Sequence, residues 1–217
     1  MREKLSINAE LATVQIGDRI VLLLLNFIPL LHLAAVVSPW FMPWPVVTRV
    51  AATILALYVL PPLCARLIRV REGTMPIGGG GFFGWWLLLQ LQTLFNRFPV
   101  FEELLRIIPG LYSSWLRLWG ARIGRLTYWA PGTLILDRSF LEIGDDVVFG
   151  AGVRLNAHVL ANGELLLGTI RIGSGAQIGG YSLLTAGTVV AENEQTRAFL
   201  ISPPGSHWKG GKRVRDT

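Results

Sequence analysis

A hexapeptide repeat between Ile123 and Val189 constrains the fold more than any other feature of the chain. Each of nine hexapeptides opens with an aliphatic or aromatic residue, and a small or β-branched residue follows four positions later. The openers are Ile123, Trp129, Ile135, Ile143, Phe149, Leu155, Ile172, Ile178 and Leu184. A helix cannot hold a six-residue period on one face, whereas a triangular coil with one hexapeptide per side points every opener into one core.

Three hexapeptides complete one turn of such a coil, so the pattern predicts a mainly β domain with a parallel β-helix of about three coils. A two-residue slip at Leu141 and Glu142 and a longer insertion at residues 160–171 interrupt the repeat. A β-sandwich with short strands is the alternative interpretation, because strand patterns read from one sequence are noisy. The regular six-residue period favours the coil.

Two uncharged apolar stretches, residues 20–37 and 50–63, precede the repeat. Each lies in a segment that approaches the roughly 20 residues needed to cross a bilayer. Three prolines and two tryptophans separate them at residues 39–45, as expected of a tight turn at an aromatic belt. The second stretch, and the lack of a small-x-small cleavage site, favour a retained helical hairpin over a cleaved signal peptide.

Charge predicts how this hairpin is oriented. Most basic residues that flank it lie on one side, and they are Arg2, Lys4, Arg19, Arg66, Arg69 and Arg71; only Arg49 lies near the connecting turn. The positive-inside rule then predicts a multi-pass protein of the inner (cytoplasmic) membrane with both termini and the repeat domain in the cytoplasm. The formal net charge of +6 fits contact with anionic membrane lipids, and nucleic acid is not expected as a partner because no nucleic-acid-binding motif is present.

A glycine run at residues 78–81 and an amphipathic region at residues 82–118 connect the hairpin to the repeat. The run lacks the preceding strand and the following Lys-Ser/Thr of a phosphate-binding loop, so it predicts a flexible joint. The amphipathic region predicts helices that lie in the membrane interface, cover the open first coil, or do both. We therefore divide the chain into a membrane anchor (1–73), a Gly-rich joint with amphipathic helices (74–118) and a repeat domain with its tail (119–217).

The chain has three histidines, and one of them is a candidate catalyst. His32 lies in the first apolar stretch and, without an acidic partner, is expected to pack between helices. His207 lies in the tail and is expected at the surface. His158 follows the opener Leu155 by three positions, so it should project outward where the insertion begins; imidazole titrates near neutrality and suits a general base there. A metal site is not expected, because the three histidines lie in different regions.

Several segments of the repeat resemble the hexapeptide-repeat acyltransferases. They are Leu155-Asn156-Ala157-His158, Ile170-Arg171-Ile172-Gly173, Ile178-Gly179-Gly180-Tyr181-Ser182, the approach Trp119-Gly120-Ala121-Arg122-Ile123-Gly124 and the exit Ser202-Pro203-Pro204. The resemblance covers residues 111–209. More narrowly, the chain is similar to the membrane-anchored branch of that family and to the terminal acyltransferase-like domain of some peptide synthetases.

The resemblance implies a left-handed coil, a homotrimer with active sites between subunits, and an acyl donor that is a thioester of CoA or acyl carrier protein, with no cofactor bound permanently. It implies that His158 is the catalytic base and that backbone amides at Gly179 and Gly180 line the donor's pantetheine arm. The family usually has a second His or an acid beside the catalytic one. Asp137 and Glu164 are the nearest candidates here, and neither stands at a telling spacing.

A basic tail ends the chain, with Lys209, Lys212, Arg213 and Arg215. These residues could hold the phosphates of CoA, for which Lys209 is the candidate, or an anionic membrane surface. A solvated, disordered end is the alternative.

Together these features predict a membrane-bound acyltransferase that moves an acyl group, expected to be acetyl, to a hydroxyl or amine of a lipid-linked or saccharide acceptor. His158 would act as general base in a direct transfer. The single cysteine, Cys64, lies near the end of the second apolar stretch, where it suits neither an intrachain disulfide nor a covalent intermediate. A non-catalytic trimeric membrane scaffold is the alternative function, and substitution of His158 separates the two.

Overall fold

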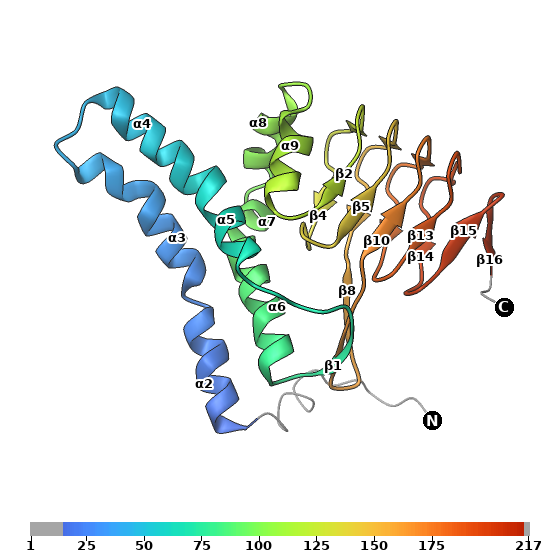
Figure 1. The fold of residues 1–217 in the computed structure, drawn as a ribbon, viewed down its shortest axis with the longest axis horizontal. Coiled ribbons are helices and arrows are strands. Elements are labelled where there is room, and N and C mark those ends of the chain that lie inside the picture. Colours follow the sequence, from blue (N-terminus) through green and yellow to red (C-terminus); the bar gives the residue numbers. More distant parts are fainter. Residues whose placement is uncertain (1–14, 215–217) are drawn as a thin grey trace.

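Two apolar helical segments and a β coil lie side by side in the computed structural model, which describes residues 15–214 (Figure 1). The helical segments form the blue and cyan part of the picture, and the coil forms its yellow to red part. Four short helices, in green, stand between the two. The two apolar segments thus come first in the described part of the chain and the coil comes last.

The apolar segments, Ile16–Phe41 and Val46–Arg66, are each long and apolar enough to cross a membrane. Their elements are α2 (Ile16–Leu25), α3 (Ile28–Val37), the 3-10 helix η1 (Ser38–Phe41), α4 (Val46–Ile54), the π-helix η2 (Leu55–Val59) and α5 (Leu60–Arg66). Pro29 follows the break between α2 and α3, and Pro61 follows η2. Both irregular turns are explained by proline, which has no N–H to donate to the carbonyl four residues earlier. His32 packs between the segments, with Nε2 3.2 Å from the carbonyl oxygen of Ala56.

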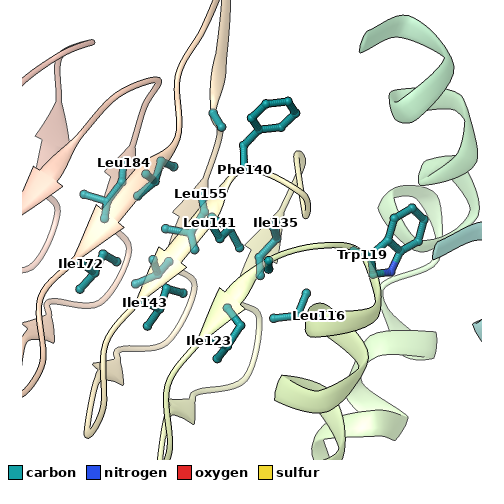
Figure 2. Packing of buried hydrophobic residues seen from close by; sticks show 14 of the residues in the cluster. Leu116, Trp119, Ile123, Ile135, Phe140, Leu141, Ile143, Leu155, Ile172 and Leu184 are labelled. Carbon is teal, nitrogen blue, oxygen red and sulfur yellow. The ribbon is translucent and has the colours of Figure 1, made fainter. Parts of the chain in front are cut away.

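Four further helices cover the open end of the coil. They are α6 (Gly80–Leu91), α7 (Thr93–Arg97), α8 (Val100–Arg106) and α9 (Leu111–Leu118). Leu116 and Trp119 lie next to Ile123 and Ile135 of the first coil, within one continuous hydrophobic core (Figure 2). Of the two roles predicted for residues 82–118, covering the first coil is therefore observed, and a place in the membrane interface stays a prediction.

Successive hexapeptides enter three parallel sheets in rotation. The first sheet holds β2 (Arg122–Ile123), β5 (Leu141–Ile143), β10 (Ile170–Ile172), β13 (Val189–Val190) and β15 (His207–Lys209); the second holds β3 (Tyr128–Trp129), β6 (Val148–Phe149) and β11 (Gln177–Ile178); the third holds β4 (Leu134–Ile135), β7 (Arg154–Leu155), β12 (Leu183–Leu184) and β14 (Ile201–Ser202). Openers stack in register, since Ile143 pairs with both Ile123 and Ile172. All nine predicted openers are buried. Figure 2 labels Ile123, Ile135, Ile143, Leu155, Ile172 and Leu184 among them. The left hand of the coil stays a prediction.

The coil is longer than the sequence predicted. After the three coils that were expected, Val190, Thr196, Ser202 and Trp208 continue the six-residue period through a fourth coil and into a fifth. The second sheet is continued there by a parallel bridge between Gln177 and Gln195. Thr196 and Ser202 are buried although they are polar. The pattern of apolar openers therefore stops at Leu184 while the coil continues.

The insertion at residues 160–171 is a β-hairpin rather than an irregular loop. Its strands, β8 (His158–Ala161) and β9 (Glu164–Leu167), pair antiparallel. The connecting segment after the second apolar helix adds β1 (Gly73–Pro76) to the outer edge of β9. Gly78 and Gly79 then form the turn from β1 into α6 with positive φ values of 90° and 108°, which glycine adopts without strain.

The basic tail forms a second hairpin. Strand β15 pairs antiparallel with β16 (Lys212–Val214), and Lys209 pairs with Lys212 across the turn. The carboxylate of Glu194 accepts hydrogen bonds from the N–H groups of Gly210 and Gly211, at 2.6 and 2.8 Å. The alternative of a disordered end is thus wrong for residues 209–214, and Arg215 lies outside the described residues.

Candidate active site

His158 is the first residue of β8, at the point where the chain leaves the coil after Leu155. Its Nδ1 lies 2.7 Å from Oδ2 of Asp137. The side chain of Asp137 is 2% exposed and that of His158 is 15% exposed. The two residues form a hydrogen-bonded His–Asp dyad that is largely shielded from solvent, on the outside of the coil.

The register of the coil brings the dyad together. Ile135 and Leu155 are stacked openers in β4 and β7, one coil apart. Asp137 follows Ile135 by two residues and His158 follows Leu155 by three, so both side chains leave the same corner of consecutive coils. The prediction that Asp137 stands at no telling spacing was therefore wrong. Positions counted within the hexapeptides, rather than along the chain, would have identified it.

Trp85 of α6 closes the dyad on the side of the helices. Its indole N–H donates to Oδ1 of Asp137 at 3.0 Å. Its ring centroid lies 4.8 Å from that of His158, with the two rings inclined at 62°. Trp85 is buried, and no local sequence pattern could have assigned it, because its contacts with the dyad depend on how α6 packs against the coil.

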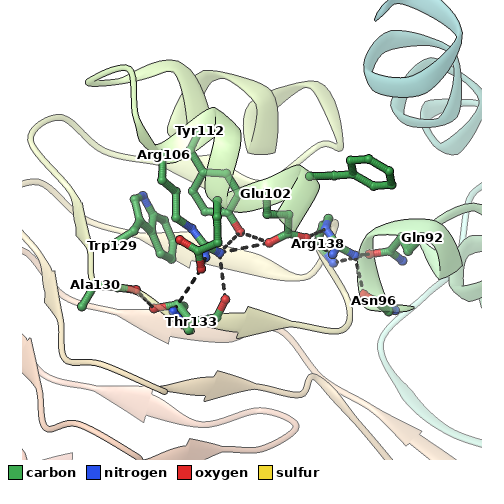
Figure 3. A network of polar contacts seen from close by, with 12 residues as sticks. Gln92, Asn96, Glu102, Arg106, Tyr112, Trp129, Ala130, Thr133 and Arg138 are labelled. Carbon is green, nitrogen blue, oxygen red and sulfur yellow. Dashed lines mark hydrogen bonds and ion pairs between the residues drawn. The ribbon is translucent and has the colours of Figure 1, made fainter. Parts of the chain in front are cut away.

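A buried ionic network adjoins the dyad (Figure 3). Arg138, the residue after Asp137, is completely buried and forms an ion pair with Glu102 of α8. Its backbone N–H and its guanidinium both donate to the side-chain oxygen of Gln92, at 2.8 and 3.0 Å. Arg106 donates to the other oxygen of Glu102 at 3.0 Å. The network anchors the backbone next to Asp137 to α8 and, through Gln92, to the junction between α6 and α7.

Tyr112 completes this network and stays protonated in it. Burial raises the pKa of Tyr112, and the negative charge of Glu102 raises it further. The hydroxyl donates to Glu102 at 2.6 Å and accepts from Arg106 at 2.9 Å. Burial alone would lower the pKa of Arg106, but Tyr112 and Glu102 outweigh it, so the net shift is upward. The charges at the helix–coil junction are therefore fixed near neutral pH.

The other predicted site residues lie away from the dyad within one chain. Gly179 and Gly180 follow β11 in the second sheet, and Lys209 ends β15 in the first sheet, whereas His158 follows the third sheet. A Cβ on Gly179 would stand 2.3 Å from the backbone of Arg197, so the next coil requires glycine there. Lys209 is exposed. Within one chain, His158 and Asp137 lie together, whereas the residues predicted to bind the donor do not lie beside them.

The geometry suits proton abstraction. When Nδ1–H of His158 donates to the carboxylate of Asp137, the lone pair on Nε2 is left to accept a proton. A carboxylate that holds the imidazole also stabilises the imidazolium that forms, which is the logic of a base oriented by an acid. Within residues 15–214, no group of three or more His, Cys, Asp or Glu side chains is placed to hold a metal ion.

Comparisons with known proteins give the following. No family model matches the chain. The chain is 27% identical over 169 residues to a delta-poly-L-ornithine synthetase of Acinetobacter baumannii (strain AB307-0294), and the match covers 73% of this chain but 12% of that protein.

Among solved structures, a maltose O-acetyltransferase from Clostridium difficile 630 is 15% identical with a TM-score of 0.41, over 58% of this chain and 87% of that one. A hexapeptide-repeat acetyltransferase from Vibrio cholerae O1 biovar eltor, complexed with acetyl coenzyme A, is 19% identical with a TM-score of 0.35, over 44% of this chain and 60% of that one. A galactoside acetyltransferase in complex with coenzyme A is 18% identical with a TM-score of 0.30, over 54% of this chain and 79% of that one. Because these scores are below 0.5, the functional argument rests on the geometry of the dyad.

Proposed function

We propose that the chain is a membrane-bound acyltransferase that moves an acyl group from a thioester to a hydroxyl of a lipid-linked or saccharide acceptor. One observation carries the proposal. A His–Asp dyad, shielded by a tryptophan, stands where a hairpin leaves a parallel hexapeptide coil. The resemblance of the segment around His158 to hexapeptide-repeat acyltransferases agrees with it.

The reaction needs one base and no covalent enzyme intermediate. Nε2 of His158 takes the proton of the acceptor hydroxyl, and the oxygen attacks the carbonyl carbon of the thioester. The tetrahedral intermediate collapses, the C–S bond breaks, and the leaving thiolate takes the proton back from His158. Asp137 holds the imidazole in place and stabilises its charged form. The products are an ester and a free thiol.

The donor is a CoA or acyl carrier protein thioester, and the acyl group is acetyl. In a homotrimer, Gly179, Gly180 and Lys209 of one subunit would reach the dyad of another, because within one chain they leave the coil from other sheets. Lys209 is exposed and would pair with a phosphate of the donor. No cofactor is bound permanently in this mechanism.

The acceptor is expected at a membrane because of the surface of the helical segments. Leu23, Leu30 and Val47 are more than half exposed. A soluble protein rarely exposes contiguous apolar surface on this scale. Trp85 bonds to the dyad, and the next residue of α6, Trp86, donates a hydrogen bond to Asn26 of the first apolar segment at 3.0 Å. One helix, α6, therefore separates the dyad from that surface. We propose that the protein lies in the inner membrane with its coil in the cytoplasm.

Radiolabelled acetyl-CoA provides the test. The full chain, purified in detergent, is incubated with it and with a lipid extract from the native cells, and label in the organic phase is counted and identified by mass spectrometry. His158→Ala should lower transfer by roughly two to four orders of magnitude. His207→Ala, a histidine outside the dyad, is the control and should retain activity. Equal transfer by wild type and His158→Ala would refute the catalytic role and favour a trimeric scaffold.

A further inference from the structure

Trp85 is the one described side chain outside the coil with a hydrogen bond to the dyad. Its indole N–H occupies Oδ1 of Asp137, and His158 occupies Oδ2. Both carboxylate oxygens therefore have a donor, which fixes the plane of the carboxylate. The T-shaped contact between Trp85 and His158, at 4.8 Å between centroids, also limits rotation of the imidazole.

The helix that carries Trp85 is itself held by the first apolar segment. α6 packs against α2 and α3. Oδ1 of Asn26, in the break between those two helices, accepts hydrogen bonds from Trp86 Nε1 and Gln90 Nε2, both at 3.0 Å. Adjacent tryptophans of α6 thus point to different partners, one to the dyad and one to the apolar segment.

We propose that Trp85 is a positioning residue of the dyad, so that the coil alone does not form a complete active site. The proposal rests on the acyltransferase function given above. Trp85 touches no reacting atom. It holds the carboxylate of Asp137 in the orientation that presents Nδ1 of His158 with an acceptor, and it keeps water from that carboxylate, since both residues are almost fully buried.

Electrostatics distinguishes positioning from simple packing. A hydrogen bond from the indole draws charge from the carboxylate of Asp137, which weakens its attraction for the imidazolium of His158. The charged side chain next to Asp137 in the sequence, that of Arg138, points to Glu102 and is neutralised by it. Without the indole N–H, the carboxylate should therefore accept a stronger hydrogen bond from Nδ1–H of His158.

A matched pair of variants tests the proposal. Trp85→Phe keeps an aromatic ring and removes the hydrogen bond to Asp137, whereas Trp86→Phe makes the same change one residue along α6 and removes the bond to Asn26. Transfer from acetyl-CoA gives kcat and KM. The full chain labelled with 15N-histidine, in detergent micelles, gives the tautomer and hydrogen bonding of His158. The chain has three histidines, and His158→Ala assigns the signal.

We expect Trp85→Phe to lower kcat about tenfold with little change in KM, as for other residues that orient a catalytic group. The 15N signals of His158 should differ from those of wild type and the pH profile of kcat should move, because the carboxylate of Asp137 has lost its bond to the indole. Trp86→Phe should match wild type in both measurements, because Gln90 still bonds α6 to Asn26. Equal behaviour of the two variants, whether both normal or both impaired, would overturn the positioning role.

The same experiment separates this proposal from the proposed function. If His158→Ala abolishes transfer and Trp85→Phe does not affect it, the acyltransferase function stands and the positioning role is refuted. If His158→Ala transfers normally, the catalytic function is refuted. In that case, His158 signals that change in Trp85→Phe and not in Trp86→Phe would show that Trp85 positions the imidazole even though the function is not acyl transfer.

Discussion

Arg138 and Glu102 form an ion pair that is closed off from solvent, and it joins the coil to α8 (Figure 3). Glu102 is the carboxylate that neutralises Arg138, since the other side chains that bond to the guanidinium belong to Gln92 and Asn96. Three aromatic rings surround the guanidinium at 5.6 to 5.8 Å. A charge in such surroundings depends on its partner, so this pair fixes how the helices sit on the first coil.

Loss of Glu102 should destabilise the protein strongly. Glu102→Gln leaves Arg138 buried without a countercharge, and removal of one partner from a buried pair costs about 3–5 kcal/mol. Glu103→Gln is the matched control. Glu103 is partly exposed and pairs with Arg106, which keeps its contact with Glu102, so a cost of about 1 kcal/mol is expected. Denaturant unfolding in detergent measures both, and equal costs would contradict the assignment.

Asp137→Asn should fold normally and lose most of its activity. The amide retains the size of the carboxylate but cannot stabilise an imidazolium, and its NH2 group favours the wrong tautomer of His158. Turnover should fall by roughly two to four orders of magnitude. Asp145→Asn, which removes an exposed carboxylate that bonds to Arg125 on the coil, should leave turnover unchanged. Turnover near wild type in Asp137→Asn would show that His158 does not depend on the dyad.

The sequence predicted the coil well because its information is local. The openers repeat every six residues, and the structure buries all nine. The pattern of apolar openers underestimated the length of the coil, because Thr196 and Ser202 occupy interior positions although they are polar. Ser202 is accommodated by hydrogen bonds with Thr188 and Trp208, at 2.7 and 3.1 Å, and hydropathy does not reveal such partners.

The candidate site was predictable in part. His158 stands at an outward hexapeptide position beside an insertion, so its place followed from the repeat. Asp137 was recoverable from the register of Ile135 over Leu155. Trp85 was not recoverable, because its contact with Asp137 depends on packing between helices and coil across 52 residues of sequence. Strand β1 was not predictable either, because a strand of four residues is too short to show a periodic pattern and its pairing with β9 depends on the fold.

Acid should loosen the hairpin that carries His158. Glu72 accepts hydrogen bonds from the N–H and hydroxyl of Thr169, at 2.9 and 2.8 Å, and pairs with Arg171 at 3.0 Å. Burial alone would raise the pKa of Glu72, but these donors and the charge of Arg171 outweigh it and lower the pKa below the ordinary 4.5. A carboxyl whose pKa is lower in the folded than in the unfolded protein stabilises the fold at pH values above its unfolded pKa. That stabilisation is lost as the pH falls through its folded pKa.

Hydrogen exchange checks the effect of acid on this contact. After correction for intrinsic rates, backbone amides of β1 and β9 should exchange faster at about pH 3 than at about pH 6, because protonated Glu72 no longer holds Thr169. Glu72→Gln should show the faster exchange at both values, which removes the pH dependence. Equal protection of the wild-type strands at both values would refute the role of Glu72.

Both termini should be cytoplasmic. Arg66 ends the second apolar segment, Arg69 follows it, and Arg19 lies in the first turns of the first segment. These positive charges gather at one end of the hairpin, whereas Arg49 alone lies near its turn among the described residues. A reporter that is active only in the cytoplasm, fused after Thr217, should therefore be active. Activity of a periplasmic reporter at the same position would place the coil outside the cytoplasm, away from cytoplasmic thioester donors.

The chain should assemble as a cyclic trimer. Tyr181 and Phe199 stack at 5.4 Å on one corner of the coil, and both are largely exposed, as is Ile201 beside them. Exposed aromatic pairs of this kind mark interfaces, and identical chains most often close into rings. Light scattering in detergent should give three copies of the 24.0 kDa chain after subtraction of the micelle.

The corner itself can be tested for its part in assembly. Phe199→Arg places a charge where a neighbouring subunit would cover an aromatic ring, so it should shift the protein to monomers while each coil stays folded. Arg154→Ala is a suitable control, because Arg154 lies on the outside of β7 and leaves the aromatic corner unchanged. A wild-type monomer in light scattering, or a Phe199→Arg variant that remains trimeric, would show that this corner is not the contact between subunits.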